Sequence, residues 1–313
     1  MVMARLPSRL TLAIFLSTLM KHGFLLFILA ALRLPVVAQD MPLSQVLLDE
    51  EDWELVSEGF KFTDGPCVDK YGHFYFTGST DDTSHVYRIN PDGKLSILHK
   101  TQAFASGSQI GPDGRWYFCR IRDNQVVALN QSGQETVIAS LEKPNDLVVT
   151  KSGDIYVTQT GKSQVSHVSM KGEVTVMDIG IPRPNGITLS ADQGTLAVSD
   201  SQGPHIWTFR IENDGRLSHR ERYMTMRMPS QGGRSRGDGM TTDAAGRYYV
   251  TTAEGIQMFD PTGRISGVIS KPSRHEGVTN IVFAGNERKY LYVTSGGRIY
   301  RRLTQAKGAI FFE

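Results

Sequence analysis

Six repeats of one pattern, each about 40 residues long, run through most of the chain. The first half of a repeat is an apolar run, a turn and a second run rich in Val, Ile, Tyr and Phe. The second half is a pair of short segments around a polar turn. The second runs are FYFTGS (74–79), WYFCRI (116–121), IYVTQT (155–160), LAVSDS (196–201), YYVTTA (248–253) and LYVTSG (291–296). This period lies in the range of β-propeller repeats.

The segments inside each repeat have the pattern of β-strands. They are short, alternate in polarity and are separated by polar turns that contain glycine, as in residues 86–98, 126–138, 165–177 and 256–269. No helical periodicity competes with this pattern after residue 45. Four strands in each of six repeats predict an all-β, six-bladed β-propeller with four antiparallel strands per blade.

A ring of blades needs a closing strand, because open edges invite aggregation. Trp53–Val56 precedes the first repeat and is expected to join the last blade; Gly308–Phe312 is the alternative closing segment. We therefore expect one propeller domain over residues 53–313, preceded by a short linker, residues 39–52.

Residues 1–38 have the features of a secretory signal. They contain basic residues, an apolar stretch (Phe24–Leu32) and a cleavage motif, Val36-Val37-Ala38, which would make Gln39 the mature start. Translation from Met20 would give a more compact signal. An uncleaved anchor is the alternative, although the two apolar stretches, Leu10–Met20 and Phe24–Leu32, are each shorter than a spanning helix. We expect a secreted or periplasmic protein that leaves the membrane after cleavage.

Composition excludes some classes of function. The chain has 313 residues and a formal net charge of +2, without Lys/Arg tracts, which argues against nucleic acid as a partner. It has no coenzyme glycine motif and no P-loop, and we expect a monomer. Its two cysteines, Cys67 and Cys119, either pair, as export permits, or are small buried hydrophobic residues; the second interpretation is favoured.

A small oxygen-bearing residue marks the start of each repeat. Each begins a short apolar run, and each but the last lies eight or nine residues before a turn glycine (Gly72, Gly114, Gly153, Gly194 or Gly246). Equivalent positions in a closed ring converge on one axis. The six residues are Asp64, Ser106, Asn145, Asn185, Asp238 and Asn280.

These oxygens point to a hard cation. Carboxylate and amide oxygens without Cys or His suit Ca²⁺, with Mg²⁺ or Mn²⁺ as alternatives. Asp64 and Asp238 would balance the charge of a divalent ion, and water or substrate would complete its shell. Taken singly, segments such as Pro184-Asn185-Gly186 are ordinary turn sequences, and only their shared register favours a site.

Longer segments extend the argument to a known family. The chain resembles the regucalcin/gluconolactonase (senescence-marker-protein-like) family of six-bladed propellers over essentially Trp53 to Leu303. The segments that carry the resemblance are GFKFTDGPCVDKYGHFYFTGS, KPNDLVVTKSGDIYVTQT, RPNGITLSADQGTLAVSDS, RGDGMTTDAAGRYYVTTAEGIQMFDPTG and TNIVFAGNERKYLYVT. The resemblance implies that Asp64, Asn185 and Asp238 are metal ligands with Asn145 nearby, and that Asp238 is also the general base. We expect all four residues to form the metal site.

The chain departs from the family at several positions. Asp64 replaces a Glu and is one methylene shorter. Lys143 replaces an Arg that holds substrate oxygens in the family, and a lysine cannot form the bidentate contact that an arginine makes. The second blade has Ser106-Gly107-Ser108 where relatives often have Asn-Gly-Leu, and Cys119-Arg120 where they have Cys-Glu. The metal chemistry is expected to be kept and the substrate pocket to be changed.

Further residues complete the hypothesis. Lys143, Asn145, Ser106 and Asn280 are expected to bind substrate. Asp200 is either a turn cap or a residue that orients a ligand of the metal. The leading interpretation is an exported, calcium-dependent lactone hydrolase of the gluconolactonase type. The alternatives are a metal-dependent esterase or phosphotriesterase-like hydrolase, and a non-enzymatic propeller that binds a carbohydrate or a partner protein.

Overall fold

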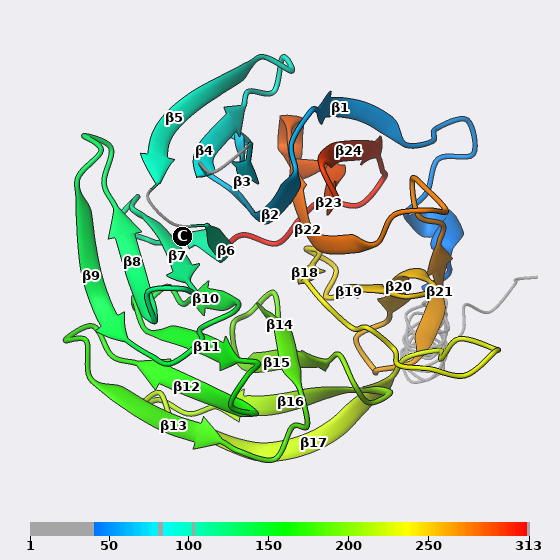
Figure 1. Ribbon diagram of the computed structural model, residues 1–313. Coiled ribbons are helices and arrows are strands. Elements are labelled where there is room, and N and C mark those ends of the chain that lie inside the picture. Colours follow the sequence, from blue (N-terminus) through cyan, green and yellow to red (C-terminus); the bar gives the residue numbers. More distant parts are fainter. Residues whose placement is uncertain (1–40, 81–83, 102–103, 312–313) are drawn as a thin grey trace, which may run out of the picture. The chain divides into compact units, whose positions relative to one another are not determined.

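The computed structural model describes residues 41–80, 84–101 and 104–311. They form six antiparallel sheets of four strands each, arranged around a common axis (Figure 1). The predicted six-bladed, all-β propeller is confirmed. The strands nearest the axis are the first of each repeat, namely β2, β6, β10, β14, β18 and β22.

Each of the first three blades follows chain order from axis to rim. Blade 1 comprises β2 (Phe62–Val68), β3 (Phe74–Ser79), β4 (Ser84–Ile89) and β5 (Leu95–Thr101). Blade 2 comprises β6 (Ala105–Ile110), β7 (Trp116–Arg120), β8 (Gln125–Leu129) and β9 (Glu135–Ser140). Blade 3 comprises β10 (Leu147–Val149), β11 (Ile155–Gln159), β12 (Gln164–Val168) and β13 (Val174–Asp178).

The other three blades repeat this plan, except that the last borrows its outer strand. Blade 4 comprises β14 (Pro184–Leu189), β15 (Thr195–Asp200), β16 (His205–Ile211) and β17 (Leu217–Thr225). Blade 5 comprises β18 (Met240–Thr242), β19 (Tyr248–Thr252), β20 (Gly255–Phe259) and β21 (Ile265–Ile269). Blade 6 comprises β22 (Val278–Ala284), β23 (Tyr290–Ser295), β24 (Arg298–Leu303) and β1 (Glu54–Glu58).

The ring closes through β1, which pairs antiparallel with β24. Arg301 and Glu54 face each other in this pair, with Arg301 Nε and Nη2 donating to the two carboxylate oxygens of Glu54 at 2.7 and 3.0 Å. The closing strand predicted near Trp53–Val56 is confirmed. The alternative, that the C-terminus fills this edge, is wrong, because that edge of β24 is already paired.

The C-terminal segment, Thr304–Phe311, instead runs across the propeller (red in Figure 1). Gly308 forms a β-bridge with Asp243, and the Ala309 amide donates to the Thr242 carbonyl at 3.0 Å. Farther along, Gln193 Nε2 donates to the Phe311 carbonyl at 3.1 Å. The segment therefore lies across one end of the channel, where the inner strands end and lead into the repeat's turn glycines.

Apolar side chains between blades form the core, and the segment before β1 belongs to it. Val46 is fully buried against Tyr249 and Ile256, just after the short 3₁₀ helix η1 (Leu43–Gln45). Burying such a side chain stabilises the fold by roughly 1.5–3 kcal/mol. The part of the expected linker that the structure describes, residues 41–52, is thus packed against blades 5 and 6.

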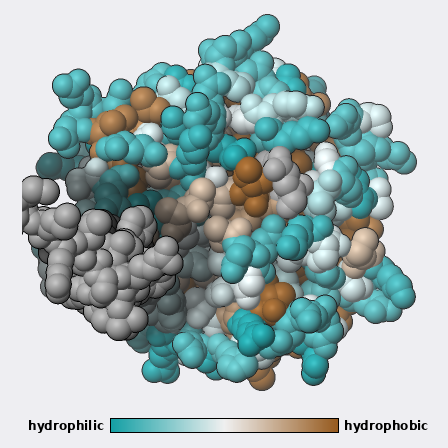
Figure 2. Space-filling view, turned by 180° about the vertical axis from the view of Figure 1, so that it is seen from behind, coloured by the Kyte–Doolittle hydropathy of each residue, from teal (hydrophilic) through white to brown (hydrophobic). Residues whose placement is uncertain are grey.

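Helices contribute little to the described chain: η1 and a second short 3₁₀ helix, η2 (Asn286–Arg288). None of the described helices has the length and apolar character needed to cross a bilayer. The face seen in Figure 2 is mostly hydrophilic, with small, scattered hydrophobic patches. Scattered patches of this kind are normal on a folded protein.

Four of the five turn glycines identified in the repeat have the left-handed backbone conformation that favours glycine. Gly72, Gly114, Gly153 and Gly246 have positive φ, between 76° and 89°. In blade 4, where the spacing is one residue longer, the left-handed residue is Gln193 rather than Gly194.

Candidate functional site

Strand pairing tests the shared register of the six oxygen-bearing residues. In four blades the residue before that position pairs with the end of the second strand: Thr63 with Gly78, Ala105 with Arg120, Pro184 with Asp200, and Val278 with Ser295. In blades 3 and 5, the residue two positions after the oxygen-bearing residue pairs with the third residue of the second strand: Leu147 with Val157, and Met240 with Val250. The shared position is therefore Asp64, Ser106, Asn145, Asn185, Asp238 and Thr279.

The register is thus correct in five blades and off by one in the sixth. Asn280 lies one residue deeper than Thr279, at the position that Asp146 holds in blade 3. The sixth repeat has η2 where the others have a simple glycine turn, so counting back from a glycine fails there.

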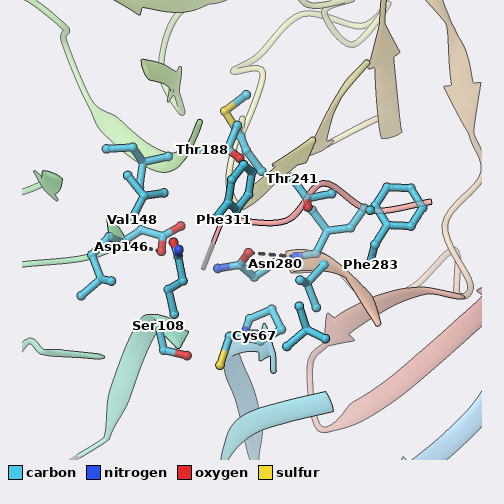
Figure 3. A pocket seen from close by; sticks show the side chains of 18 of the residues that line it. Cys67, Ser108, Asp146, Val148, Thr188, Thr241, Asn280, Phe283 and Phe311 are labelled. Atoms are coloured by element: carbon cyan, nitrogen blue, oxygen red, sulfur yellow. Dashed lines mark hydrogen bonds between the residues drawn. The ribbon is translucent and has the colours of Figure 1, made fainter. Parts of the chain in front are cut away.

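Two layers of polar side chains result at the end of the channel where the inner strands begin, the end opposite the C-terminal segment. The outer layer contains Asp64, Asn145, Asn185 and Asp238, all partly exposed. The deeper layer contains Asp146 and Asn280, each 7 % exposed. These two side chains face each other across a small cavity of about 60 Å³, whose far side includes Phe311 of the C-terminal segment (Figure 3).

Hydrogen bonds fix the carboxyl and amide groups. Asp64 Oδ1 accepts from the Gly65 amide at 2.8 Å and lies 3.5 Å from Asn280 Nδ2. Asn280 Oδ1 in turn accepts from the Ile281 amide at 2.8 Å. Asp146 Oδ1 accepts from the Leu147 amide at 2.8 Å. Asn280 is thereby oriented so that its NH₂ group faces Asp64.

Three carboxyl groups lie near one another here, and the charge of Asp64 raises the cost of ionising the other two. Burial raises the pKa of Asp64 to about 6. Burial, with the nearby charge of Asp64, raises the pKa of Asp146 to about 7. Burial and the charges of Asp64 and Asp146 hold the pKa of Asp238 well above its usual range, against the opposing charge of Arg183. A bound cation would relieve this repulsion.

The donor set fits a calcium-type ion only if amide oxygens take part. Within the described ranges, no three His, Cys, Asp or Glu side chains are grouped so that they could hold a metal ion. Asn145 and Asn185 supply the missing donor type: among the described residues, their side-chain amides make no hydrogen bond. Two carboxylates and two amides match the oxygen chemistry of Ca²⁺, Mg²⁺ or Mn²⁺.

Ser106 has a different place from the one expected for a substrate-binding residue. It is 2 % exposed, and its hydroxyl donates to the Asn145 carbonyl at 2.5 Å. This bond ties blade 2 to blade 3 and holds the backbone of Asn145. Ser106 therefore acts on the site through Asn145 rather than through a free hydroxyl.

Asp200 is 2 % exposed and supports the loops around the site. Its Oδ1 accepts from the amides of Gln202 at 3.0 Å and Arg183 at 3.2 Å. The first bond is the turn cap that the sequence left as one interpretation. The second fixes the backbone just before Pro184-Asn185.

Lys143 is exposed at the start of blade 3, where its amide donates to Asn124 Oδ1 at 2.8 Å. Its φ of 51° is unusual for a residue with a β-carbon. The side chain lies over the turn at Gly161, where an added β-carbon would be 2.7 Å from Lys143 Cδ.

Two residues were not predicted as parts of the site. Asp146 is the deeper carboxyl, and it directly follows Asn145, which the sequence did identify. Arg183 stands two residues before Asn185, as Lys143 stands before Asn145, and its charge reaches Asp238. The parallel of Lys-Pro-Asn and Arg-Pro-Asn was the signal in the sequence that could have identified it.

Cys67 and Cys119 are free thiols and both are buried. Trp116 Nε1 contacts Cys67 Sγ at 3.1 Å, and burial raises the pKa of this thiol to about 12. The favoured interpretation of the cysteines as buried hydrophobic residues is confirmed.

A six-bladed propeller with carboxyl and amide groups gathered at one end of its channel defines a class of single-domain proteins. The family described as the SMP-30/Gluconolactonase/LRE-like region matches residues 121–297, more than half of the 313 residues. The chain belongs to this family, as its resemblance to the regucalcin/gluconolactonase propellers predicted.

Individual relatives agree with this placement. The chain is 25% identical over 295 residues to a gluconolactonase of Zymomonas mobilis, covering 82% of each protein. It is 24% identical over 225 residues to a pentonolactonase of Haloferax volcanii, covering 69% of this chain and 75% of the relative. The calcium-binding protein regucalcin of Agrobacterium tumefaciens has the same fold, with a TM-score of 0.68, 20% identity, and coverage of 84% of this chain and 96% of that one.

Proposed function

We propose that this protein hydrolyses a lactone, with a divalent cation, most simply Ca²⁺, at the end of the channel. The observation that carries the proposal is the group of Asp64, Asp146 and Asp238, three enclosed carboxyls beside amide oxygens. Two relatives named for sugar lactones, a gluconolactonase and a pentonolactonase, support the reaction class. A relative in fold that is named as calcium-binding supports the cofactor.

Asp64, Asn145, Asn185 and Asp238 would hold the cation. Asp64 reaches one methylene less far than the family's Glu, and Asn280 Nδ2 steadies its carboxylate. When bound, such an ion polarises a carbonyl oxygen and lowers the pKa of water.

The chain's own groups complete the reaction. A water molecule adds to the lactone carbonyl carbon, the ring C–O bond breaks, and the products are one carboxylate and one hydroxyl on the same molecule. Asp238 accepts the proton of the attacking water and returns it to the ring oxygen as that oxygen leaves, and the new carboxylic acid releases its proton to solvent. Asn145 and Lys143 hold substrate oxygens, and Ser106 fixes Asn145 through its backbone carbonyl.

A substrate panel tests the proposal. Purified protein is assayed with sugar lactones, an aryl ester and a phosphotriester, after chelation and after return of Ca²⁺, Mg²⁺ or Mn²⁺. We expect lactone turnover that disappears with the chelator and returns with Ca²⁺. Turnover of the ester or phosphotriester alone would assign another hydrolase activity. Sugar binding without turnover of any compound would favour a binding propeller.

A further inference from the structure

The mouth of the channel carries a charged feature that the repeat makes visible. Two residues before the shared position, three consecutive blades have a cation: Lys143 in blade 3, Arg183 in blade 4 and Arg236 in blade 5. We call these three residues the cationic collar. All three are exposed. At the same position, blades 1, 2 and 6 have Phe62, Phe104 and Gly277.

The backbone under the collar is held firmly. The Lys143 amide donates to Asn124 Oδ1 at 2.8 Å, and the Arg183 amide donates to Asp200 Oδ1 at 3.2 Å. Next to Arg236, the Ser235 hydroxyl is fully buried and donates to the Asp200 carbonyl at 2.9 Å. Asp200 thus anchors the segments of two collar residues at once.

Two of the collar residues adopt a conformation that side chains disfavour. Lys143 has φ 51° and Arg236 has φ 54°, both in the left-handed region. Unfavourable backbone geometry of this kind persists only where surrounding contacts impose it, and it concentrates at functional sites. Glycine would adopt the same backbone at lower cost.

The positive charge of the collar is available to a ligand. None of the three side chains forms an ion pair with any residue that the structure describes. Glu142, the neighbour of Lys143, forms its ion pair with Lys162 instead, at 2.8 Å. Lys162, and to a smaller extent Lys143, lower the pKa of Glu142. Arg120, in blade 2 on the same side, is by contrast already paired with Glu135 and with Asp123. The charge of Arg183 reaches inward as far as Asp238.

Blades 1 and 2 have aromatic residues at this position. The rings of Phe62 and Phe104 lie 5.4 Å apart, and Phe62 is 38 % exposed. Aromatic rings of this kind offer a face to the C–H side of a sugar ring, while cations bind anionic oxygens. A ligand between these two blades and the cationic collar would therefore meet aromatic rings on one side and cations on the other.

We propose that the cationic collar selects lactones that carry a second, anionic group, phosphate or carboxylate, away from the lactone carbonyl. The proposal rests on the lactone hydrolase function proposed above and names its substrate class. The anionic group contacts Arg183 and Arg236, the sugar ring lies toward Phe62 and Phe104, and the lactone carbonyl faces the carboxyl and amide layer below.

The test compares three lactones with the same ring. These are gluconolactone, its phosphate ester on the primary hydroxyl, and the lactone of glucaric acid, which has a carboxylate at that carbon. We measure kcat/KM with Ca²⁺ for the natural protein and for Arg183→Gln, Arg236→Gln and Arg234→Gln. The last is a matched control, because Arg234 is exposed in the same loop but outside the register.

We expect the natural protein to prefer an anionic lactone over gluconolactone, and the two anionic lactones to reveal whether phosphate or carboxylate is favoured. Arg183→Gln and Arg236→Gln should each lower this preference about 10- to 100-fold, mainly through KM, as expected for loss of a hydrogen bond to a charged group. Arg234→Gln should leave the ratio within about twofold. Equal activity on all three lactones, or an equal preference in all variants, would overturn the proposal.

A binding measurement separates failure of the collar from failure of the reaction. Calorimetry compares gluconate with its phosphate ester on the natural protein and on Arg183→Gln, all with Ca²⁺. Tighter binding of the phosphate ester that is lost in the variant supports the collar even if no lactone is hydrolysed. Equal binding of the two compounds overturns the collar whatever the catalytic result.

Discussion

Asp238 has two roles in the proposed reaction, and replacing it with Asn separates them. Asn keeps an oxygen donor of similar size but cannot accept a proton, and it removes one charge. We expect Asp238→Asn to lower kcat by about 10²- to 10⁴-fold even at saturating Ca²⁺. A calcium titration of lactone hydrolysis measures this. Full recovery of activity at high calcium would make Asp238 a ligand only.

Asp64 should matter for calcium affinity more than for the chemical step. Asp64→Asn removes a charge from the proposed ligand set, so we expect weaker calcium binding and recovery of much of the activity in excess metal. Asp64→Glu lengthens the reach by one methylene and should hold or raise the affinity. Calorimetric titration of calcium into each variant is the measurement. Affinities indistinguishable from that of the natural protein would place Asp64 outside the metal site.

At the scale of single residues, the sequence predicted where the site residues lie along the blades better than it predicted which atoms their side chains contact. The register placed Asp64, Asn145, Asn185 and Asp238 at one end of the channel because a repeat fixes backbone positions. It did not show that the Ser106 hydroxyl is taken up by the Asn145 carbonyl. Nor did it show that Asp146 turns its carboxyl into the same space, since neither fact follows from the spacing of a repeat.

Among the elements, the C-terminal segment should contribute measurably to the stability of the fold. Phe311 lies against the apolar cluster around Val148 and Ile187 and is only partly buried. We expect Phe311→Ala to lower the free energy of unfolding by about 1–3 kcal/mol, less than for a fully buried ring. Urea unfolding with Ca²⁺ present measures the change. Ile179→Ala, at a side chain that is 72% exposed, is the control and should be close to neutral. An unchanged midpoint for Phe311→Ala would mean that the segment is only loosely attached.

The strands themselves were predictable, because alternation and turn glycines are local signals. The path of the C-terminal segment was not. Its contacts with Thr242, Asp243 and Gln193 join residues far apart in the chain, and Gly308–Phe311 carries no strand pattern that points to them. The same holds for Val46, whose burial among residues of blades 5 and 6 could not be read from a segment that resembles a linker.

For the whole molecule, metal and pH should be linked through the enclosed carboxyls. The pKa values of Asp64 and Asp146, about 6 and about 7 in the fold, lie above those of an unfolded chain, near 4. Between about pH 4 and pH 7, the folded, metal-free protein therefore binds more protons than the unfolded chain does. Its stability falls as pH rises through that window. The raised pKa of Asp238 acts in the same direction.

Calcium competes with these protons, so we expect it to raise Tm more at pH 8 than at pH 5. Thermal unfolding with chelator and with Ca²⁺ at both pH values measures the effect. Asp146→Asn, which removes one of the titrating groups, should reduce the pH dependence of the metal-free protein. A larger gain from calcium at pH 5 would contradict the link.

Export remains a prediction about residues 1–38, which lie outside the described part of the chain. We expect cleavage after Ala38, so that N-terminal sequencing of exported protein begins at Gln39. Cleavage there would leave Val46 and β1 in place. Recovery of the intact chain from membranes would identify the segment as an anchor.

The C-terminal segment also bears on how a catalytic cycle ends. Because Thr304–Phe311 lies across one end of the channel, reactant and product share the other end. Ring opening adds one carboxylate to the charge that the reactant already carries, and the product must leave past Lys143, Arg183 and Arg236. We therefore expect departure of the hydroxy acid, rather than ring opening, to limit steady-state turnover, and the accumulating acid to inhibit competitively.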